Sequence, residues 1–328
     1  MNVNIVSNGK VTLEYLEEKR NAGAAATSIQ RVWRNYIAAR NERVATQLKN
    51  IFCDFNSSEN GEEKDTTIFI KLGRATKEFP LRIRKTEKLG FLFSIPALDN
   101  PDDVNYLLTG GILLNLYPNR SLKKCYGLRG DDLMKLTDAI AKAFQFSQVS
   151  LTDASHYVLR GDAKMASEEI TRFANRHNLS MEKSNGKYIN PIINKYHKAL
   201  SIGVDFCLRI IRPLIKGNSW YGKYGYYPKD LTSDQYLMRV KELRSIDLKK
   251  SMDTNGSFEG NSFVRMMYQE FSEVIENREH SVGNFFEWLS TNRPYSLEIV
   301  YNDISRGSNE ICTAKSKIGQ MALIKKMT

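Results

Sequence analysis

The chain opens with a long stretch of helical character. Between residues 11 and 49, helix-forming residues dominate, with acidic side chains early and basic ones late, the order that the helix dipole favours. Gly23 is the one position at which this stretch is expected to divide into two helices. The pattern predicts an N-terminal helical region over residues 1–50, followed by a polar, turn-rich linker over residues 51–65.

After the linker the period of the apolar residues changes to two, which indicates a sheet. A helix is expected at 130–145, where Leu133, Leu136 and Ile140 recur at helical spacing, and a further strand at 148–155. Four successive strands are predicted before that helix, at residues 66–72, 79–85, 90–95 and 111–117.

The remainder of the chain is mainly helical in pattern. A strand is expected at 295–301, an aromatic and glycine-rich loop at 216–228, and a frayed end at 315–328. Helices are predicted at residues 164–178, 191–215 (bent or ended near Pro213), 233–250 and 261–290. The expected fold class is therefore α/β (α+β), with an antiparallel-rich mixed sheet flanked by helices. It divides into a central domain at 66–230 and an appended helical region at 231–328.

Composition narrows the class of protein. With 41% hydrophobic and 26% charged residues among 328, the chain should bury a globular core. No apolar run reaches roughly 18 uncharged residues, so no membrane span is expected. The start of the chain also lacks a secretory leader pattern. The four cysteines form no CxxC pair and the four histidines are scattered. We therefore expect no metal site, reduced thiols and a cytoplasmic location.

The net charge of +11 leaves several partners open. A basic protein can bind nucleic acid, an anionic membrane face or an acidic protein, and it can also simply have a basic surface. The basic residues are spread along the chain and do not interleave with aromatic repeats. Nucleic acid is therefore a weaker expectation than an acidic protein, but it is kept as an alternative.

The segment AAATSIQRVWRNYIAARNERV, residues 24–44, carries the clearest pattern in the chain. On a helix, its apolar residues recur every three or four positions and form one stripe, with arginines on either side. The stripe consists of Ile29, Val32, Trp33, Tyr36, Ile37 and Arg40, flanked by Arg31, Arg34 and Arg43.

This segment resembles an IQ motif, the helix that binds calmodulin or myosin light chains. Asn35 stands where the motif usually has glycine, and the second basic residue, Arg40, comes one position late, with Ala39 in the expected place. The alternative is an amphipathic helix packed on its own domain. The resemblance implies calmodulin or a calmodulin-like protein as partner, bound through Ile29, Gln30, Trp33, Arg34, Tyr36, Ile37 and Arg40.

The centre of the chain resembles the GNAT acyltransferases. In that family a glycine-containing loop before a helix holds the pyrophosphate of coenzyme A, and here Lys124, Gly127 and Gly130 are the nearest matches. The later segment SWYGKYGYYP matches a family segment whose tyrosine protonates the departing thiolate, which implies Tyr221 as the catalytic acid.

The loop also departs from the family. Arg129 replaces a small residue, and Asp131 and Asp132 put negative charge where a phosphate would lie. An aspartate at a helix start also serves as an N-cap without any ligand. The alternative for SWYGKYGYYP is a turn whose aromatic side chains close the end of the sheet.

Together the two resemblances imply a calmodulin-binding, GNAT-like protein that transfers an acyl group from acetyl-CoA or another acyl-CoA to an amine or protein. If the source is a bacterium or a virus, the helix implies an effector acting in the host cytosol. Enzymatic activity is left open. The alternatives are a non-catalytic interaction protein with a degenerate acyltransferase-like fold, and a basic nucleic-acid-binding protein.

Overall fold

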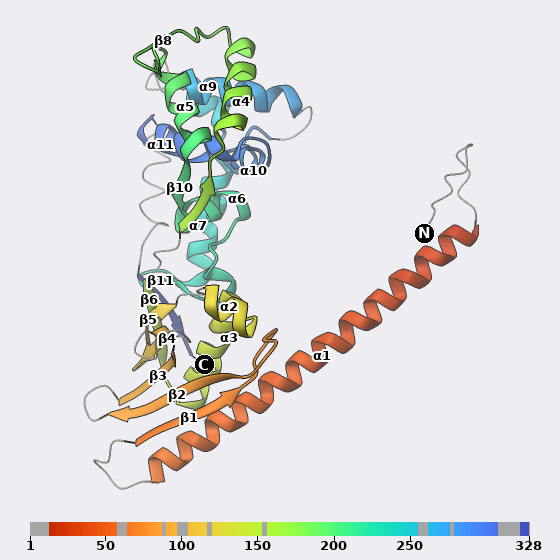
Figure 1. Ribbon diagram of the computed structural model, residues 1–328, viewed down its shortest axis with the longest axis vertical. Helices are drawn as coiled ribbons and strands as arrows, with labels where there is room; N and C mark the ends of the chain where they lie inside the picture. Colours follow the sequence, from red (N-terminus) through yellow and green to blue (C-terminus); the bar gives the residue numbers. More distant parts are fainter. Residues whose placement is uncertain are drawn as a thin grey trace. The chain divides into compact units, whose positions relative to one another are not determined.

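The computed structural model describes residues 13–57, 64–86, 90–96, 104–116, 120–152, 156–254, 262–275, 279–307 and 322–327. The chain forms two compact units (Figure 1). Unit 1 comprises residues 1–149 and 326–328, and unit 2 comprises residues 150–325. This division differs from the predicted one, because the boundary falls inside the expected central domain of residues 66–230, and the N-terminal helix belongs to unit 1.

Unit 1 is built on an antiparallel meander. From β1 to β5, each strand pairs antiparallel with the next. β6 is the neighbour of β5, so the order β1-β2-β3-β4-β5-β6 follows the sequence. The strands are β1 (Lys64–Ile70), β2 (Phe79–Thr86), β3 (Gly90–Pro96), β4 (Val104–Thr109), β5 (Ile112–Leu116) and β6 (Gln148–Thr152). The four predicted strands and the one at 148–155 are confirmed. β4 was not predicted, because VNYLLT is apolar without strict alternation.

Helices α1 (Leu13–Ser57), α2 (Arg120–Tyr126) and α3 (Gly130–Ala143) complete unit 1. Ring contacts join α1 and the end of α3 to one face of the sheet. The ring centre of Phe144 lies 5.2 Å from that of Phe52 on α1 and 4.6 Å from that of Phe93 on β3. The apolar side chains of this face are buried, including Leu81, Ile83 and Phe93. The predicted helix at 130–145 is confirmed as α3.

Two expectations about the N-terminal region are wrong. α1 runs through Gly23 without a break, since one glycine in a long helix costs only about 1 kcal/mol. The expected linker at 51–65 is also shorter, because α1 continues to Ser57 and β1 begins at Lys64. Phe55 keeps the end of α1 helical by packing into the core, where it is 1% exposed. Residues 58–63 lie outside the described part of the chain.

Unit 2 is largely helical. Two small antiparallel ribbons, β7 with β10 and β8 with β9, accompany the helices, and β11 pairs with β12. Its helices are α4 (Ala163–Arg176), α5 (Pro191–Ile202), α6 (Leu208–Lys216), α7 (Ser233–Ser245), α8 (Leu248–Thr254), α9 (Ser262–Val274), α10 (Val282–Asn292) and α11 (Leu297–Gly307). Its strands are β7 (His156–Arg160), β8 (Lys183–Ser184), β9 (Lys187–Tyr188), β10 (Gly203–Cys207), β11 (Tyr227–Pro228) and β12 (Ala322–Lys326), with short 3-10 turns at Gly222–Tyr224 and Pro294–Ser296.

Five predictions for unit 2 are wrong. The helix expected at 233–250 divides into α7 and α8, and the one expected at 261–290 divides into α9 and α10. The helix expected at 191–215 is interrupted by β10, which starts at Gly203, a residue with a φ of +104° that suits glycine. The strand expected at 295–301 is helical, because Leu297, Val300, Tyr301 and Ile304 bury one helical face. The end of the chain contains β12, which pairs with β11.

Candidate partner-binding helix

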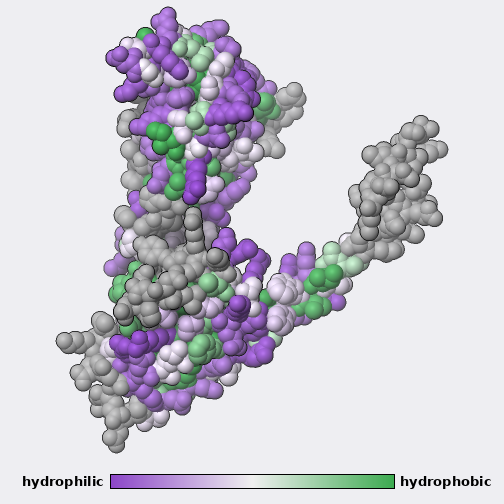
Figure 2. Space-filling model, in the orientation of Figure 1, coloured by the Kyte–Doolittle hydropathy of each residue, from purple (hydrophilic) through white to green (hydrophobic). Residues whose placement is uncertain are grey.

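The predicted stripe on α1 lies on a part of the helix that is exposed to solvent. Ile29 is 69% exposed, Val32 67%, Trp33 51% and Tyr36 47%, while Ile37 is half-buried. Gln30 and Arg34 are exposed as well. We call residues 23–39 of α1 the exposed segment; Figure 2 shows hydrophobic surface along it. A contiguous exposed apolar stripe is uncommon on the surface of a monomeric protein.

The following turns of the same helix pack on the rest of unit 1. Val44, Leu48 and Phe55 are at most 2% exposed, and Phe52 contacts the rings of Phe91 and Phe144. We call residues 40–57 the docked segment. Burying side chains of this size contributes about 1.5–3 kcal/mol each. The docked segment therefore anchors α1, and the exposed segment is its continuation.

Arg40 marks the change from one segment to the other. It is only 5% exposed, and its Nη2 donates a hydrogen bond of 2.9 Å to the carbonyl oxygen of Ala75 in the β1–β2 connection. Its guanidinium lies 5.4 Å from the centre of the Tyr36 ring, and Tyr36 in turn lies 5.8 Å from Trp33. Arg40, the second basic residue of the predicted motif, thus contacts its own domain. The other motif residues on the stripe and beside it are exposed: Ile29, Gln30, Trp33, Arg34 and Tyr36.

A chain of hydrogen bonds continues from this point into unit 1. The amide of Gly73 donates to Oδ1 of Asn41 at 3.1 Å, and the amide of Arg74 donates to Oδ1 of Asp132 at 3.2 Å. Asp132, at the first turn of α3, is 2% exposed, and its Oδ2 accepts from the amide of Arg129 at 3.2 Å. α1, the β1–β2 connection and the start of α3 are therefore joined by direct polar contacts.

The predicted coenzyme A loop lies at this start of α3. Lys124 is on α2, and the structure does not describe its side chain. The amide of Gly127 already donates to the carbonyl of Lys123 at 3.0 Å, and a Cβ at Gly127 would come within 3.1 Å of Thr76. Gly130 is the first residue of α3. It follows Arg129, whose amide donates to the carboxylate of Asp132.

This arrangement does not fit a pyrophosphate. A phosphate at a helix start needs free amides and positive charge, but here the carboxylate of Asp132 accepts from the local amides of Arg74 and Arg129. The carboxylate of Asp132 thus accepts a hydrogen bond at the helix start, as a bound anion would.

Tyr221 lies in unit 2, whereas Lys124, Gly127 and Gly130 lie in unit 1. Tyr221 is 9% exposed, its carbonyl accepts from the amides of Tyr224 and Tyr226, and its ring packs edge-on against Trp220. These contacts are those of a tight turn with packed aromatic side chains, the alternative reading of SWYGKYGYYP.

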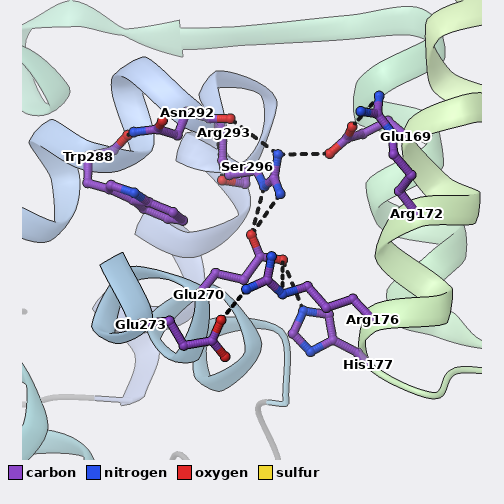
Figure 3. Close-up of polar contacts among 10 residues, drawn as sticks. All are labelled: Glu169, Arg172, Arg176, His177, Glu270, Glu273, Trp288, Asn292, Arg293 and Ser296. Atoms are coloured by element: carbon purple, nitrogen blue, oxygen red, sulfur yellow. Dashed lines mark hydrogen bonds and ion pairs between the residues drawn. The ribbon is translucent and has the colours of Figure 1, made fainter. Parts of the chain in front are cut away.

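A buried polar network in unit 2 was not found from the sequence (Figure 3). Glu270 on α9 is 2% exposed; its Oε1 lies 3.0 Å from Nε2 of His177, and its Oε2 lies 2.8 Å from Nη2 of Arg293. Arg293 also pairs with Glu169 at 3.0 Å. Burial alone would lower the pKa of Arg293, but Glu270 and Glu169 outweigh it and the pKa lies above its ordinary value.

Both oxygens of Glu270 are occupied, so the network holds α4 and α9 together with the residue after α10 and offers no open acid or base. The sequence could not reveal it, because its members come from residues 169 to 293 and share no short motif. We regard the network as structural.

Within the described ranges, no group of three or more His, Cys, Asp or Glu side chains could hold a metal ion. None of the helices described there is both long enough and apolar enough to span a bilayer. Comparisons with protein-family models, curated proteins and solved structures find no match to this chain.

Proposed function

We propose that the protein is an interaction protein whose exposed segment is the ligand of an acidic, apolar-lined clamp of the calmodulin type. The observation that supports the proposal is the stripe of Ile29, Val32, Trp33 and Tyr36, four large apolar side chains between 47% and 69% exposed on one continuous helix. An amphipathic helix with aromatic anchors is what such clamps bind.

The charge of the segment favours an acidic partner. Residues 23–41 contain no Asp or Glu, while Arg31 and Arg34 are exposed beside the stripe. Arginines around an apolar stripe complement a groove with an apolar floor and an acidic rim, and they would speed the encounter between the two proteins. A second copy of this chain would bring the same positive charge and fits less well.

The test is calorimetry of the full chain with calmodulin, with and without calcium. We expect binding in at least one condition, and at least a tenfold weaker affinity for the double variant Ile29→Ala/Trp33→Ala. Asn35→Ala is the matched control, because Asn35 is exposed on the same helix but about 200° around it from Trp33.

Two results would contradict the proposal. One is no binding of the wild-type chain in either condition. The other is self-association of the wild-type chain that Trp33→Ala abolishes, which would make a second copy the molecule that covers the stripe.

The acyltransferase reading remains a second hypothesis, and the non-catalytic alternative has the stronger support. That support is Asp132, whose carboxylate lies at the start of α3 and accepts from the amide of Arg129 in the predicted loop. Calorimetry with acetyl-CoA at millimolar concentration separates the two: we expect no heat of binding. Saturable binding that Gly127→Val weakens would restore the acyltransferase reading.

The nucleic-acid reading rests on the net charge of +11 alone. It requires an affinity for nucleic acid that falls steeply between low and moderate salt. Electrophoretic mobility shifts with duplex DNA and single-stranded RNA at two salt concentrations test it, and we expect no specific complex.

A further inference from the structure

The sequence pattern places Arg40 on the partner-binding stripe, yet the structure places it against unit 1. Its side chain is 5% exposed and donates to the carbonyl of Ala75. One turn further on, Val44 is 2% exposed, and Leu48 is fully buried. A protein that encloses a helix needs access to its sides. From residue 40 onward, one side of α1 is already covered by the rest of unit 1.

We propose that the footprint of the partner on α1 ends before Arg40. The partner then occupies the exposed segment alone and leaves the contacts between α1 and unit 1 intact. This inference rests on the proposed function and specifies it: of the residues implied by the motif resemblance, Ile29, Gln30, Trp33, Arg34 and Tyr36 bind the partner, while Arg40 serves the fold. Ile37, half-buried, lies at the edge.

The length of helix available limits the kind of clamp. Residues 23–39 span about 25 Å of helix axis. This is enough for one globular lobe with a groove, and the aromatic residues it needs are Trp33 and Tyr36, whose rings lie 5.8 Å apart. A clamp that closes around the helix on both sides of Arg40 would have to displace Leu48 and Val44 from the core of unit 1.

The contacts of Arg40 also explain why displacing it is unfavourable. Its neighbour Asn41 accepts from the amide of Gly73, and Arg74, the next residue, donates to Asp132. Pulling the docked segment away would leave the amide of Gly73 without its acceptor on Asn41 and the carbonyl of Ala75 without its donor on Arg40. An unmade buried hydrogen bond is costly, so the docked segment resists the partner.

Tyr36 is the residue at which the two functions meet. Its ring is 47% exposed and lies between Trp33 and the guanidinium of Arg40. Arg40 itself donates to the carbonyl of Ala75, so the footprint stops at this ring.

Hydrogen exchange of the wild-type chain with and without calmodulin tests this directly and needs no variant. We expect slower exchange in residues 24–39 on binding and unchanged exchange in residues 72–76 and 129–133. Faster exchange in those two segments would mean that the clamp takes Arg40 from Ala75, and it would overturn the inference.

A pair of variants gives an independent readout. Arg34→Ala should weaken calmodulin binding about three- to tenfold, whereas Arg40→Ala should change the affinity less than threefold and speed exchange in residues 72–76. Arg40→Lys, which keeps the charge, should retain the affinity as well. An equal loss of affinity from Arg34→Ala and Arg40→Ala would overturn the inference alone. No binding by the wild-type chain would overturn the proposed function and this inference with it.

Discussion

The two segments of α1 share one pattern and have opposite surroundings. In the docked segment, Val44, Leu48 and Phe55 lie in the core of unit 1, while in the exposed segment Ile29 and Trp33 lie in solvent. Both sets recur at helical spacings of four or seven residues along one helix. Periodicity therefore identifies the apolar side of a helix, but what covers that side depends on the rest of the fold.

The largest effect on stability is expected on α9, where one glutamate is buried and another glutamate of the same helix is exposed. Glu270 is 2% exposed and Glu273 is 46% exposed, three residues apart. Glu270→Ala should destabilise unit 2 by about 3–5 kcal/mol, because the buried His177 and the half-buried Arg293 both lose a carboxylate partner. Glu273→Ala should cost about 1 kcal/mol or less. Urea unfolding followed by the fluorescence of Trp288 measures both, and similar losses for the two would contradict the contrast.

The next effect concerns the stability of unit 1. Leu48→Ala removes a fully buried side chain and should cost about 2–5 kcal/mol, whereas Ile29→Ala should change stability by about 0.5 kcal/mol at most. Hydrogen exchange of amides in β2 and β3 reports on unit 1 separately from unit 2. If Ile29→Ala were as destabilising as Leu48→Ala, the exposed segment would be part of a core.

The affinity for calmodulin should show the reverse order. Trp33→Ala should weaken binding by about 2–4 kcal/mol, since buried tryptophans carry much of the energy of such interfaces. Phe52→Ala, in the docked segment, should leave the affinity nearly unchanged. Fluorescence anisotropy with labelled calmodulin measures both variants. A loss from Phe52→Ala equal to that from Trp33→Ala would mean that the partner reaches into the docked segment.

A smaller effect is expected at the junction. Asn41→Ala removes the acceptor for the amide of Gly73 and should destabilise unit 1 by about 1 kcal/mol. The neighbouring exposed change Asn35→Ala should have no measurable effect. Thermal unfolding compares the two, and an unchanged midpoint for Asn41→Ala would show that water replaces the lost acceptor without penalty.

The smallest effect is electrostatic. Raising the ionic strength from about 0.05 M to about 0.5 M should weaken calmodulin binding, because salt screens the attraction between exposed charges on the two proteins. Each exposed arginine should account for about 1 kcal/mol or less. Arg31→Gln and Arg34→Gln should each reduce the salt dependence, which titrations at three salt concentrations would measure. A salt-independent affinity would remove the argument for an acidic partner.

Much of the fold could be predicted from local pattern. The alternating strands β1, β2, β3 and β5 and the amphipathic α3 follow directly from their residues. β10 could not be predicted, because GVDFC lies between two helical patterns and is a strand only through its pairing with β7. The helix at 297–307 was missed because its apolar residues Leu297 and Val300 also suit a strand, and only burial on one helical face distinguishes the two.

The candidate site was predictable in part for the same reason. The stripe from Ile29 to Tyr36 could be read from spacing alone. The role of Arg40 could not, because the carbonyl of Ala75 lies 35 residues away in sequence. The coenzyme A loop was expected from its glycines, but whether its amides are free depends on the side chain of Asp132 and the distant amide of Arg74.

The continuity of α1 through Gly23 to Ser57 has a consequence for how the partner is held. An unbroken helix fixes both the direction in which a side chain points around the axis and its distance along the axis. Each residue is rotated by about 100° around the axis and displaced by about 1.5 Å along it. A partner bound at Trp33 would therefore keep a fixed rotational position around the helix axis relative to the sheet. Inserting two residues after Tyr36 would turn the partner by about 200°, to the opposite side of the helix.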